Sequence, residues 1–204
     1  MIPSALINLN HNMLAAVDVE TTGLLCGYHE IVQIAVVPLD SDIKPSDKLR
    51  PFYINIRPEF PQRQQSEAGR VHDLNLEDLS VTAVGQEKAA DLFDEWFVSL
   101  ELPYKKKLTP LAHNWAFERG FLSHWLGLKT MDDIFHPHAR DTMLLATSLN
   151  DAAAWHGRPC PFKRVSLTAL CERFGVINHN PHDALADALA CASVYREFIR
   201  ICFR

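Results

Sequence analysis

Residues 13–23 read MLAAVDVETTG, and this stretch decides the fold of the chain. An apolar run ends in two acids one residue apart, Asp18 and Glu20, and a Thr-Thr-Gly turn follows at once. Residues i and i+2 of a strand lie on the same side, so both carboxylates are predicted to share one face. Like charges beside an apolar core repel each other and are poorly solvated, and a divalent cation is the simplest compensation. Carboxylate oxygens suit Mg²⁺ or Mn²⁺, so we expect one of these ions here.

Composition indicates a single globular domain inside the cell. The 204 residues are 48% apolar and 22% charged, which is ordinary for a protein that buries a full core. No apolar run approaches the roughly 18 residues of a membrane helix, and residues 1–12 lack the basic start and apolar stretch of a signal peptide. Five scattered cysteines without a CxxC pair suggest reduced thiols. We therefore expect a cytoplasmic protein without a membrane partner.

The net charge of −5 argues against a protein that holds nucleic acid through a broad cationic surface. It does not exclude an enzyme that grips only a strand end, because bound metal ions reverse the local charge of an acidic site. The densest basic cluster, lysines 105–107, is read either as a solvated loop or as a track for a single strand.

Periodicity predicts strands first and helices later. Strands are expected at 13–20, 30–39, 52–57 and 108–112 and within 134–140, and helices at 86–100, 114–126, 142–155, 166–174 and from 182 nearly to the C-terminus. In the third strand, Tyr53 and Asn55 alternate with apolar neighbours. Gly175 is the expected C-cap of the fourth helix, and Asn180 and Pro181 are expected to begin the last one. This order predicts an α/β fold in which helices flank a five-stranded mixed sheet, in one domain over residues 1–204.

Further acids recur at two separate places. Glu118 lies within HNWAFERGFL (113–122), on the first turn of a predicted helix. His182 and Asp187 lie within HDALADA (182–188). Asp187 stands among alanines and a leucine, and a carboxylate in such an apolar setting needs a partner.

Together with VDVETTGL (17–24), these stretches resemble the three ordered motifs of the DnaQ-like 3′–5′ exonucleases of the DEDDh type. That family includes the epsilon proofreading subunit of DNA polymerase III, ribonuclease T and oligoribonuclease. The resemblance extends over residues 13–198, and ARDTMLLA (139–146) and SLTALCERFGV (166–176) are similar to the family's connecting segments.

The resemblance implies a ribonuclease H-like fold and two divalent cations, Mg²⁺ or Mn²⁺, held between the acids. It implies that Asp18 bridges both ions and that Glu20 and Asp187 hold the first. His182 is then the general base, and a histidine at a helix N-terminus is disfavoured as a cation, so it can accept a proton. The implied reaction removes nucleoside 5′-monophosphates from the 3′-end of single-stranded DNA or RNA.

One residue departs from the family pattern. Glu118 stands where the second motif normally carries Asp, and its side chain is one methylene longer. We expect it to reach the metal directly or to displace a bridging water, which would leave activity in place with a changed metal preference. The alternative is an exposed glutamate that the helix dipole favours on a first turn.

The family pattern also implies contacts to the terminal nucleotide. It places them at Val19, Thr21, Gly23, Leu24, Val71, His72, Asn114 and Phe117. Backbone amides would reach the 3′-end, and Leu24 would pack under a base. A zinc site at His136, His138 and Cys160 is not expected, because no matching set of ligands stands at the usual spacing.

A function of another class stays open: a binding module of the same fold that has lost its chemistry. Its support is the change at Glu118, and the intact His182 counts against it. Because the chain ends just after its last predicted helix, we expect no tail that tethers it to a polymerase, although its surface could still dock one. The sequence does not separate DNA from RNA, single from double strands, or a monomer from a homodimer.

Overall fold

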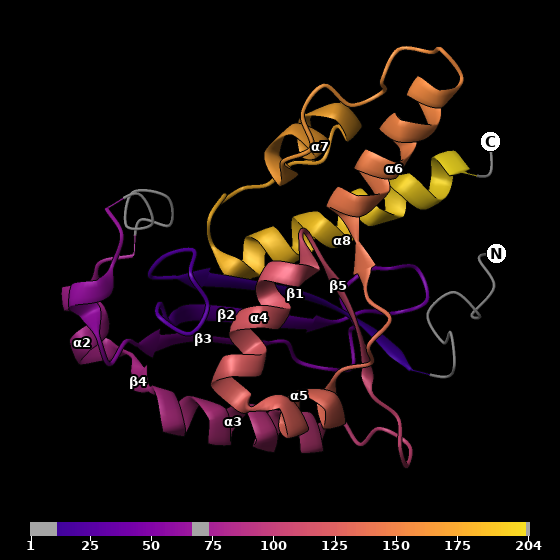
Figure 1. Cartoon of the computed structure of the whole chain (residues 1–204). Coiled ribbons are helices and arrows are strands. Elements are labelled where there is room, and N and C mark those ends of the chain that lie inside the picture. Colours follow the sequence, from indigo (N-terminus) through magenta and orange to yellow (C-terminus); the bar gives the residue numbers. More distant parts are fainter. Residues whose placement is uncertain (1–11, 67–73, 203–204) are drawn as a thin grey trace.

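A six-stranded mixed sheet forms the centre of the computed structural model, which describes residues 12–66 and 74–202 (Figure 1). The strand order is β4-β3-β2-β1-β5-β6. The strands are β1 (Met13–Thr21), β2 (Ile31–Pro38), β3 (Phe52–Arg57), β4 (Val84–Gly85), β5 (Leu108–Ala112) and β6 (Arg140–Asp141). Strands β1, β2 and β3 are antiparallel neighbours, whereas β5 runs parallel to β1, β6 to β5 and β4 to β3.

The α/β class and the mixed sheet are therefore confirmed, but the predicted count of five strands is wrong by one. The additional strand, β4, has two residues and pairs only at the end of β3. Such a short segment carries no alternation of apolar and polar residues, which is the signal on which strand prediction depends.

Helices cover both faces of the sheet. They are α2 (Leu76–Thr82), α3 (Gln86–Ser99), α4 (Trp115–Leu126), α5 (Leu128–Ile134), α6 (Thr142–Trp155), α7 (Leu167–Phe174) and α8 (Ala184–Cys202), with a 3-10 turn at Pro61–Arg63. Figure 1 shows α8 along one face, with α6 and α7 beyond it, and α3 on the other face. A fifth strand was expected within residues 134–140. Helix α5 instead extends to Ile134, and the strand consists only of β6, Arg140–Asp141.

Alternate residues of β1 face the two helical layers. Val17 and Val19 belong to the apolar cluster that includes residues of α3, α4 and α5. Leu14 and Ala16 belong to the cluster formed with α8. The period-2 pattern of β3 is also confirmed, since Phe52 and Ile56 are buried while Tyr53 lies more exposed on the other face. This alternation fixes which side chains of the sheet meet α8.

The start of the last helix differs from the prediction. Helix α8 begins at Ala184, and the preceding residue, Asp183, accepts a hydrogen bond from the backbone N–H of Ala186 at 3.0 Å. His182 has a φ of +67°, which a right-handed helix cannot contain. Asn180 and Pro181 therefore belong to a turn before the helix, whereas the predicted C-cap at Gly175 is confirmed by its left-handed conformation.

None of the helices in the described part of the chain is long and apolar enough to cross a bilayer. The cysteines whose side chains are described, Cys26, Cys160, Cys171 and Cys191, are free thiols, in line with the prediction for residues 12–66 and 74–201.

Candidate active site

Asp18 and Glu20 lie on the face of β1 that is turned towards α8. They continue the series of even-numbered positions whose earlier members, Leu14 and Ala16, pack against that helix. In the ladder with β2, Asp18 stands opposite Ala35 and Glu20 opposite Gln33. Residues i and i+2 of a strand face the same side, so both carboxylates are presented to α8, as predicted.

Helix α8 and the turn before it bring a third acid and a histidine to this face. Glu20, His182 and Asp187 each offer a ligand atom, and these three atoms lie within 4.8 Å of one another. Two carboxylate oxygens and one imidazole nitrogen form a donor set suited to a divalent cation. Across residues 12–66 and 74–202, this is the one group of three or more such side chains that the geometry brings within metal-binding range.

The charges of the acids are poorly compensated by the protein itself. Burial, followed by repulsion from Asp187 and Asp183, raises the pKa of Glu20 to about 8. Burial, with repulsion from Glu118 and Glu20, holds the pKa of Asp18 well above its ordinary value. Without a cation these carboxyl groups bind their protons more tightly than free carboxyl groups do. A cation would replace those protons, which is the behaviour expected of ligands that fit a metal.

Glu118 is buried rather than exposed on the first turn of α4. Its side chain is 3% exposed, and its Oε2 atom has no hydrogen-bond partner among the described residues. Burial raises the pKa of Glu118 well above its ordinary value, and its charge acts on the carboxyl of Asp18. The alternative of a solvated helix-end glutamate is therefore wrong. A buried carboxylate oxygen without a partner instead fits a position that a cation would complete.

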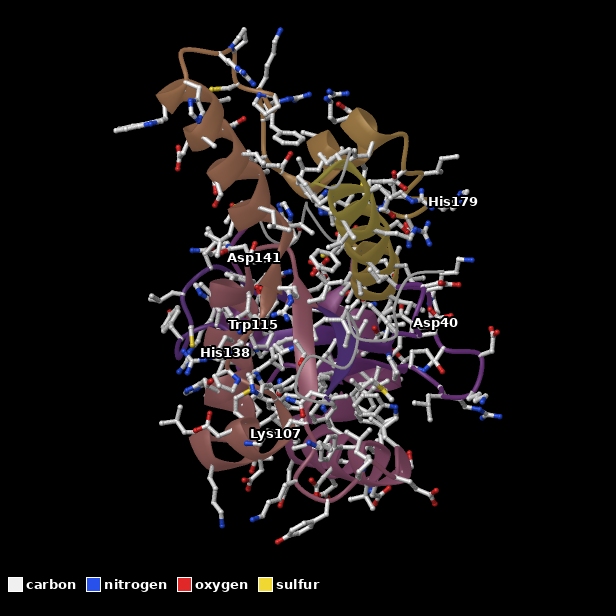
Figure 2. The ribbon with its side chains drawn as sticks, turned by 90° about the vertical axis from the view of Figure 1, so that its right-hand side faces the viewer. Asp40, Lys107, Trp115, His138, Asp141 and His179 are labelled. Atoms are coloured by element: carbon white, nitrogen blue, oxygen red, sulfur yellow. The ribbon has the colours of Figure 1, made fainter. Side chains whose placement is uncertain are left out.

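Asp141, for which no role was expected from the sequence, is hydrogen-bonded to the start of α4. The Oδ2 atom of Asp141 accepts a hydrogen bond from the backbone N–H of Trp115 at 2.8 Å, and the two residues lie next to each other in Figure 2. Its Oδ1 atom accepts bonds from Met143 and Leu144 at 2.9 and 3.0 Å. One carboxylate thus caps both α4 and α6. The signal was present, since an aspartate directly before the predicted helix at Thr142 is a typical N-cap.

The turn before α8 is hydrogen-bonded to the side chain of Asp187 on that helix. The backbone N–H of His182 donates a hydrogen bond to Asp187 Oδ2 at 3.1 Å, and Asn178 donates its side-chain N–H to Asp187 Oδ1. These two bonds fix the orientation of the Asp187 carboxylate. His182 is exposed, so its ring remains accessible to solvent.

Of the residues expected to contact the terminal nucleotide, some face the site and others do not. Thr21 donates its hydroxyl to the carbonyl of Gly23 at 2.7 Å, which closes the turn that follows the acids. The Leu24 side chain is 75% exposed, while its backbone N–H donates to Gln65 Oε1 at 3.2 Å. Leu24 can therefore meet a base, but its amide is already engaged. Val19 points to the opposite face of β1, so its side chain does not reach this site.

Other residues of the expected set lie on α4 or outside the described residues. Asn114 precedes α4 in a left-handed conformation with a φ of +77°. The Phe117 ring lies tilted against the ring of Phe121, with 4.8 Å between their centroids. Val71 and His72 lie outside the described residues, so their predicted contacts stay predictions.

The lysine cluster lies away from the acids. Leu108, which follows lysines 105–107, pairs with Met13 at the start of β1, whereas Glu20 lies at the end of that strand. Seven residues of strand separate the two ends by about 23 Å. Lys107 also donates its ammonium to the carbonyl of Asp132, and Figure 2 shows it well away from Asp141. The solvated-loop interpretation of this cluster is the better one.

Comparison with known proteins identifies relatives of the whole described core. The family model described as Exonuclease (RNase_T) matches residues 15–195. The DNA polymerase III subunit epsilon of Rickettsia prowazekii is 30% identical over 181 residues, which cover 87% of this chain and 70% of that protein. The epsilon subunit of Haemophilus influenzae is also 30% identical, over 199 residues that cover 92% of this chain and 67% of that protein.

Solved structures share the fold at lower sequence identity. The nuclease domain of 3′hExo, a DEDDh family member bound to rAMP, superposes with a TM-score of 0.65 at 18% identity, over 93% of this chain and 92% of that one. Exonuclease I of E. coli in complex with a dT13 oligonucleotide gives a TM-score of 0.69 at 16% identity, over 91% of this chain and 40% of that one. Cell-death related nuclease 4 gives 0.66 at 17% identity, and the chain spans 64% of its length. The ribonuclease H-like fold expected from the sequence is thereby shown.

Proposed function

The chain belongs to the exonuclease family whose model covers its residues 15–195, and from that premise we propose that it is a metal-dependent 3′–5′ exonuclease. The substrate is the 3′-end of a single nucleic-acid strand, and the products are nucleoside 5′-monophosphates. The observation that carries this proposal is the meeting of Glu20, His182 and Asp187 within 4.8 Å, beside the buried carboxyls of Asp18 and Glu118.

The acids divide into two groups by position. Glu20 and Asp187 lie with His182 and would hold one cation. The charge of Glu118 acts on Asp18, and its unpartnered Oε2 would be a ligand of a second cation. Asp18 would help to hold both cations. We propose Mg²⁺ or Mn²⁺ as the ions, since four carboxylates surround the site and their oxygens are hard donors. The bound ions would activate the attacking water and stabilise the leaving 3′-oxygen.

The protein's own groups orient the strand and move the proton. The exposed ring of His182 accepts the proton of the attacking water at a ring nitrogen and passes it to solvent. Thr21 and Gly23 shape the turn against which the terminal nucleotide lies, and the exposed Leu24 side chain supplies an apolar surface for its base. Phe117 is proposed to contact the neighbouring nucleotide from α4.

We infer DNA as the first substrate to test, because relatives at 30% identity are named as DNA polymerase III subunits. A polymerase is for the same reason the first protein partner to test. RNA stays a second substrate candidate, since the DEDDh nuclease domain of similar fold holds rAMP.

The decisive experiment uses matched DNA and RNA oligonucleotides that carry a label at the 5′-end. Incubation with Mg²⁺ or Mn²⁺ should shorten the strand stepwise from the 3′-end, and a 3′-terminal phosphorothioate should slow the first step. Chelation of the metal and the Asp18→Ala variant should each abolish shortening. Tight binding to a strand that keeps its full length in both metals would instead establish the alternative, a binding module without chemistry.

A further inference from the structure

The turn that presents His182 is held in an unfavourable backbone conformation. His182 has a φ of +67°, a region that residues with a side chain seldom occupy unless their surroundings impose it. Its backbone N–H donates a hydrogen bond to Asp187 Oδ2, on the first turn of α8. The residues that follow His182 must therefore be anchored to something rigid, and that anchor lies in the sheet.

Gln33 of β2 supplies the first part of the anchor. Its side chain is 2% exposed, and its Oε1 accepts a hydrogen bond at 2.7 Å from the backbone N–H of Ala184, the first residue of α8. Its Nε2 donates to the hydroxyl of Tyr53 at 3.1 Å and to Asn55 at 2.8 Å. Gln33 also stands directly opposite Glu20 in the sheet. The anchor thus lies one strand away from a proposed metal ligand.

Tyr53 of β3 supplies the second part. Its hydroxyl donates a hydrogen bond to Asp183 Oδ2 at 2.5 Å, while Asp183 Oδ1 caps α8 by accepting from Ala186. Burial and the bond to Asp183 raise the pKa of Tyr53 to about 12, so the phenol keeps the proton that it donates. Asp183 and Ala184, which directly follow His182, are therefore both bonded to side chains of the sheet.

We propose that Gln33, Tyr53 and Asp183 are positioning residues that hold the His182 ring in place against Glu20 and Asp187. The proposal deepens the proposed exonuclease function and rests on it. A general base must be held within a fraction of an ångström of its working position, and a small displacement costs rate rather than substrate binding. None of the three residues touches the reacting atoms; they act through the backbone of the turn.

The chain offers a variant that removes only the hydroxyl of Tyr53 and its two hydrogen bonds, to Gln33 and to Asp183. Tyr53 is 39% exposed, and Tyr53→Phe deletes its hydroxyl while the ring and the capping bond of Asp183 remain. Asp183→Ser is the complement, since a serine can still cap the helix but cannot reach the phenol in the same way. Tyr104→Phe is the control: it is the same chemical change at an exposed tyrosine, close to the start of β5 and so at the far end of β1 from the acids.

Steady-state kinetics separate positioning from general stability. We expect Tyr53→Phe to lower kcat about tenfold, the scale usual for a group that orients a metal ligand or base through another residue. KM should not change, and Tyr104→Phe should behave as wild type. Because Tyr53 and Asp183 share one hydrogen bond, the double variant should lose less than the two single losses combined. An additive loss, or a KM that rises in proportion as kcat falls, would overturn the proposal.

A second measurement needs neither metal nor substrate. With histidine rings labelled with ¹⁵N and ¹³C, the His182 signals can be assigned from their absence in His182→Ala. We expect those signals to shift or broaden in Tyr53→Phe and to stay in place in Tyr104→Phe. Unchanged His182 signals in Tyr53→Phe would overturn the inference. If wild-type protein degrades neither DNA nor RNA, the proposed function fails while this measurement still decides whether the anchor holds the ring.

Discussion

Glu20 on β1 and Asp187 on α8 lie on different layers of the fold, yet their ligand atoms come within 4.8 Å of each other and of His182. Neither carboxyl is paired with a cationic side chain in an ion pair of the described residues, and the pKa of each is raised, first of all by burial. The site therefore stores unfavourable electrostatic energy that a proton or a metal ion relieves.

The first prediction concerns the stability of the metal-free protein between pH 5 and pH 8. The pKa of Glu20 is raised from 4.5 to about 8, so the folded state binds this proton more tightly than the unfolded state. Protonation of Glu20 therefore contributes its full amount to the free energy of unfolding below pH 4.5. This contribution is lost as the pH rises to about 8. Each such group changes the free energy of unfolding by about 1.4 kcal/mol per pH unit within that window. Urea unfolding in EDTA at a series of pH values measures the slope.

The matched control for this prediction is Glu20→Gln, which removes the titrating group at nearly constant volume. The variant should lose part of the fall in stability between pH 5 and pH 8. Saturating Mg²⁺ or Mn²⁺ should flatten the wild-type profile in a similar way, because the cation takes the place of the proton. Identical slopes for wild type and variant would show that the Glu20 pKa is not raised.

The second prediction concerns His182. Replacement by alanine should lower kcat by about 10²-fold or more, the usual effect of removing a general base, with little change in KM. His179→Ala is the matched control, since this histidine is exposed and lies in the same segment before α8, as Figure 2 shows. Initial rates on a short single strand measure the effect. A wild-type rate in His182→Ala would mean that another group takes the proton.

The third prediction concerns Glu118. Glu118→Asp should stay active with a changed ratio of Mg²⁺ to Mn²⁺ rates, because the carboxylate remains but moves by one methylene. Glu118→Gln should lose at least about tenfold in activity or metal affinity, on the scale that follows loss of a group that supports a metal site. It should also stabilise the metal-free protein at pH 8, since it removes a buried, unpartnered charge. Rates in both metals, Mn²⁺ calorimetry and urea unfolding test these outcomes.

Wild-type behaviour of Glu118→Gln in both metals would place Glu118 outside the site. Glu172→Gln provides the control for the amide substitution itself, because Glu172 is an exposed acid on α7. Its only expected effect is the loss of a surface ion pair with Arg164, which contributes little in water.

The sequence predicted correctly those helices and strands that the period of their own apolar residues determines. The alternation at Tyr53 and Asn55 gave β3 with its observed bounds, and residues 142–155 gave α6 with its observed bounds. The spacing of Asp18 and Glu20 also sufficed to place both on one face. In these cases the period of the apolar residues and the burial they produce agree.

Contacts between distant segments decided what the sequence could not predict. Pro181 is a good local signal for a helix start, but the side chains of Asp183 and Gln33 stabilise a start at Ala184 instead. The burial of Glu118 likewise depends on how α4 docks, and that docking involves a carboxylate from the far end of β6. No window of residues around position 118 contains this information.

The last prediction concerns that carboxylate. Asp141 accepts hydrogen bonds at the starts of both α4 and α6, and removal of a capping side chain costs about 0.5–2 kcal/mol per helix. Asp141→Ala should therefore lower the free energy of unfolding by about 1–4 kcal/mol, and Asp141→Asn by about half of that, since its single oxygen can serve one helix. Because Glu118 lies on the first turn of α4, Asp141→Asn should also weaken Mn²⁺ binding. Asp151→Asn, an exposed change on α6, is the control for urea unfolding and calorimetry. Wild-type stability of Asp141→Ala would show that the double cap does not hold α4 in place.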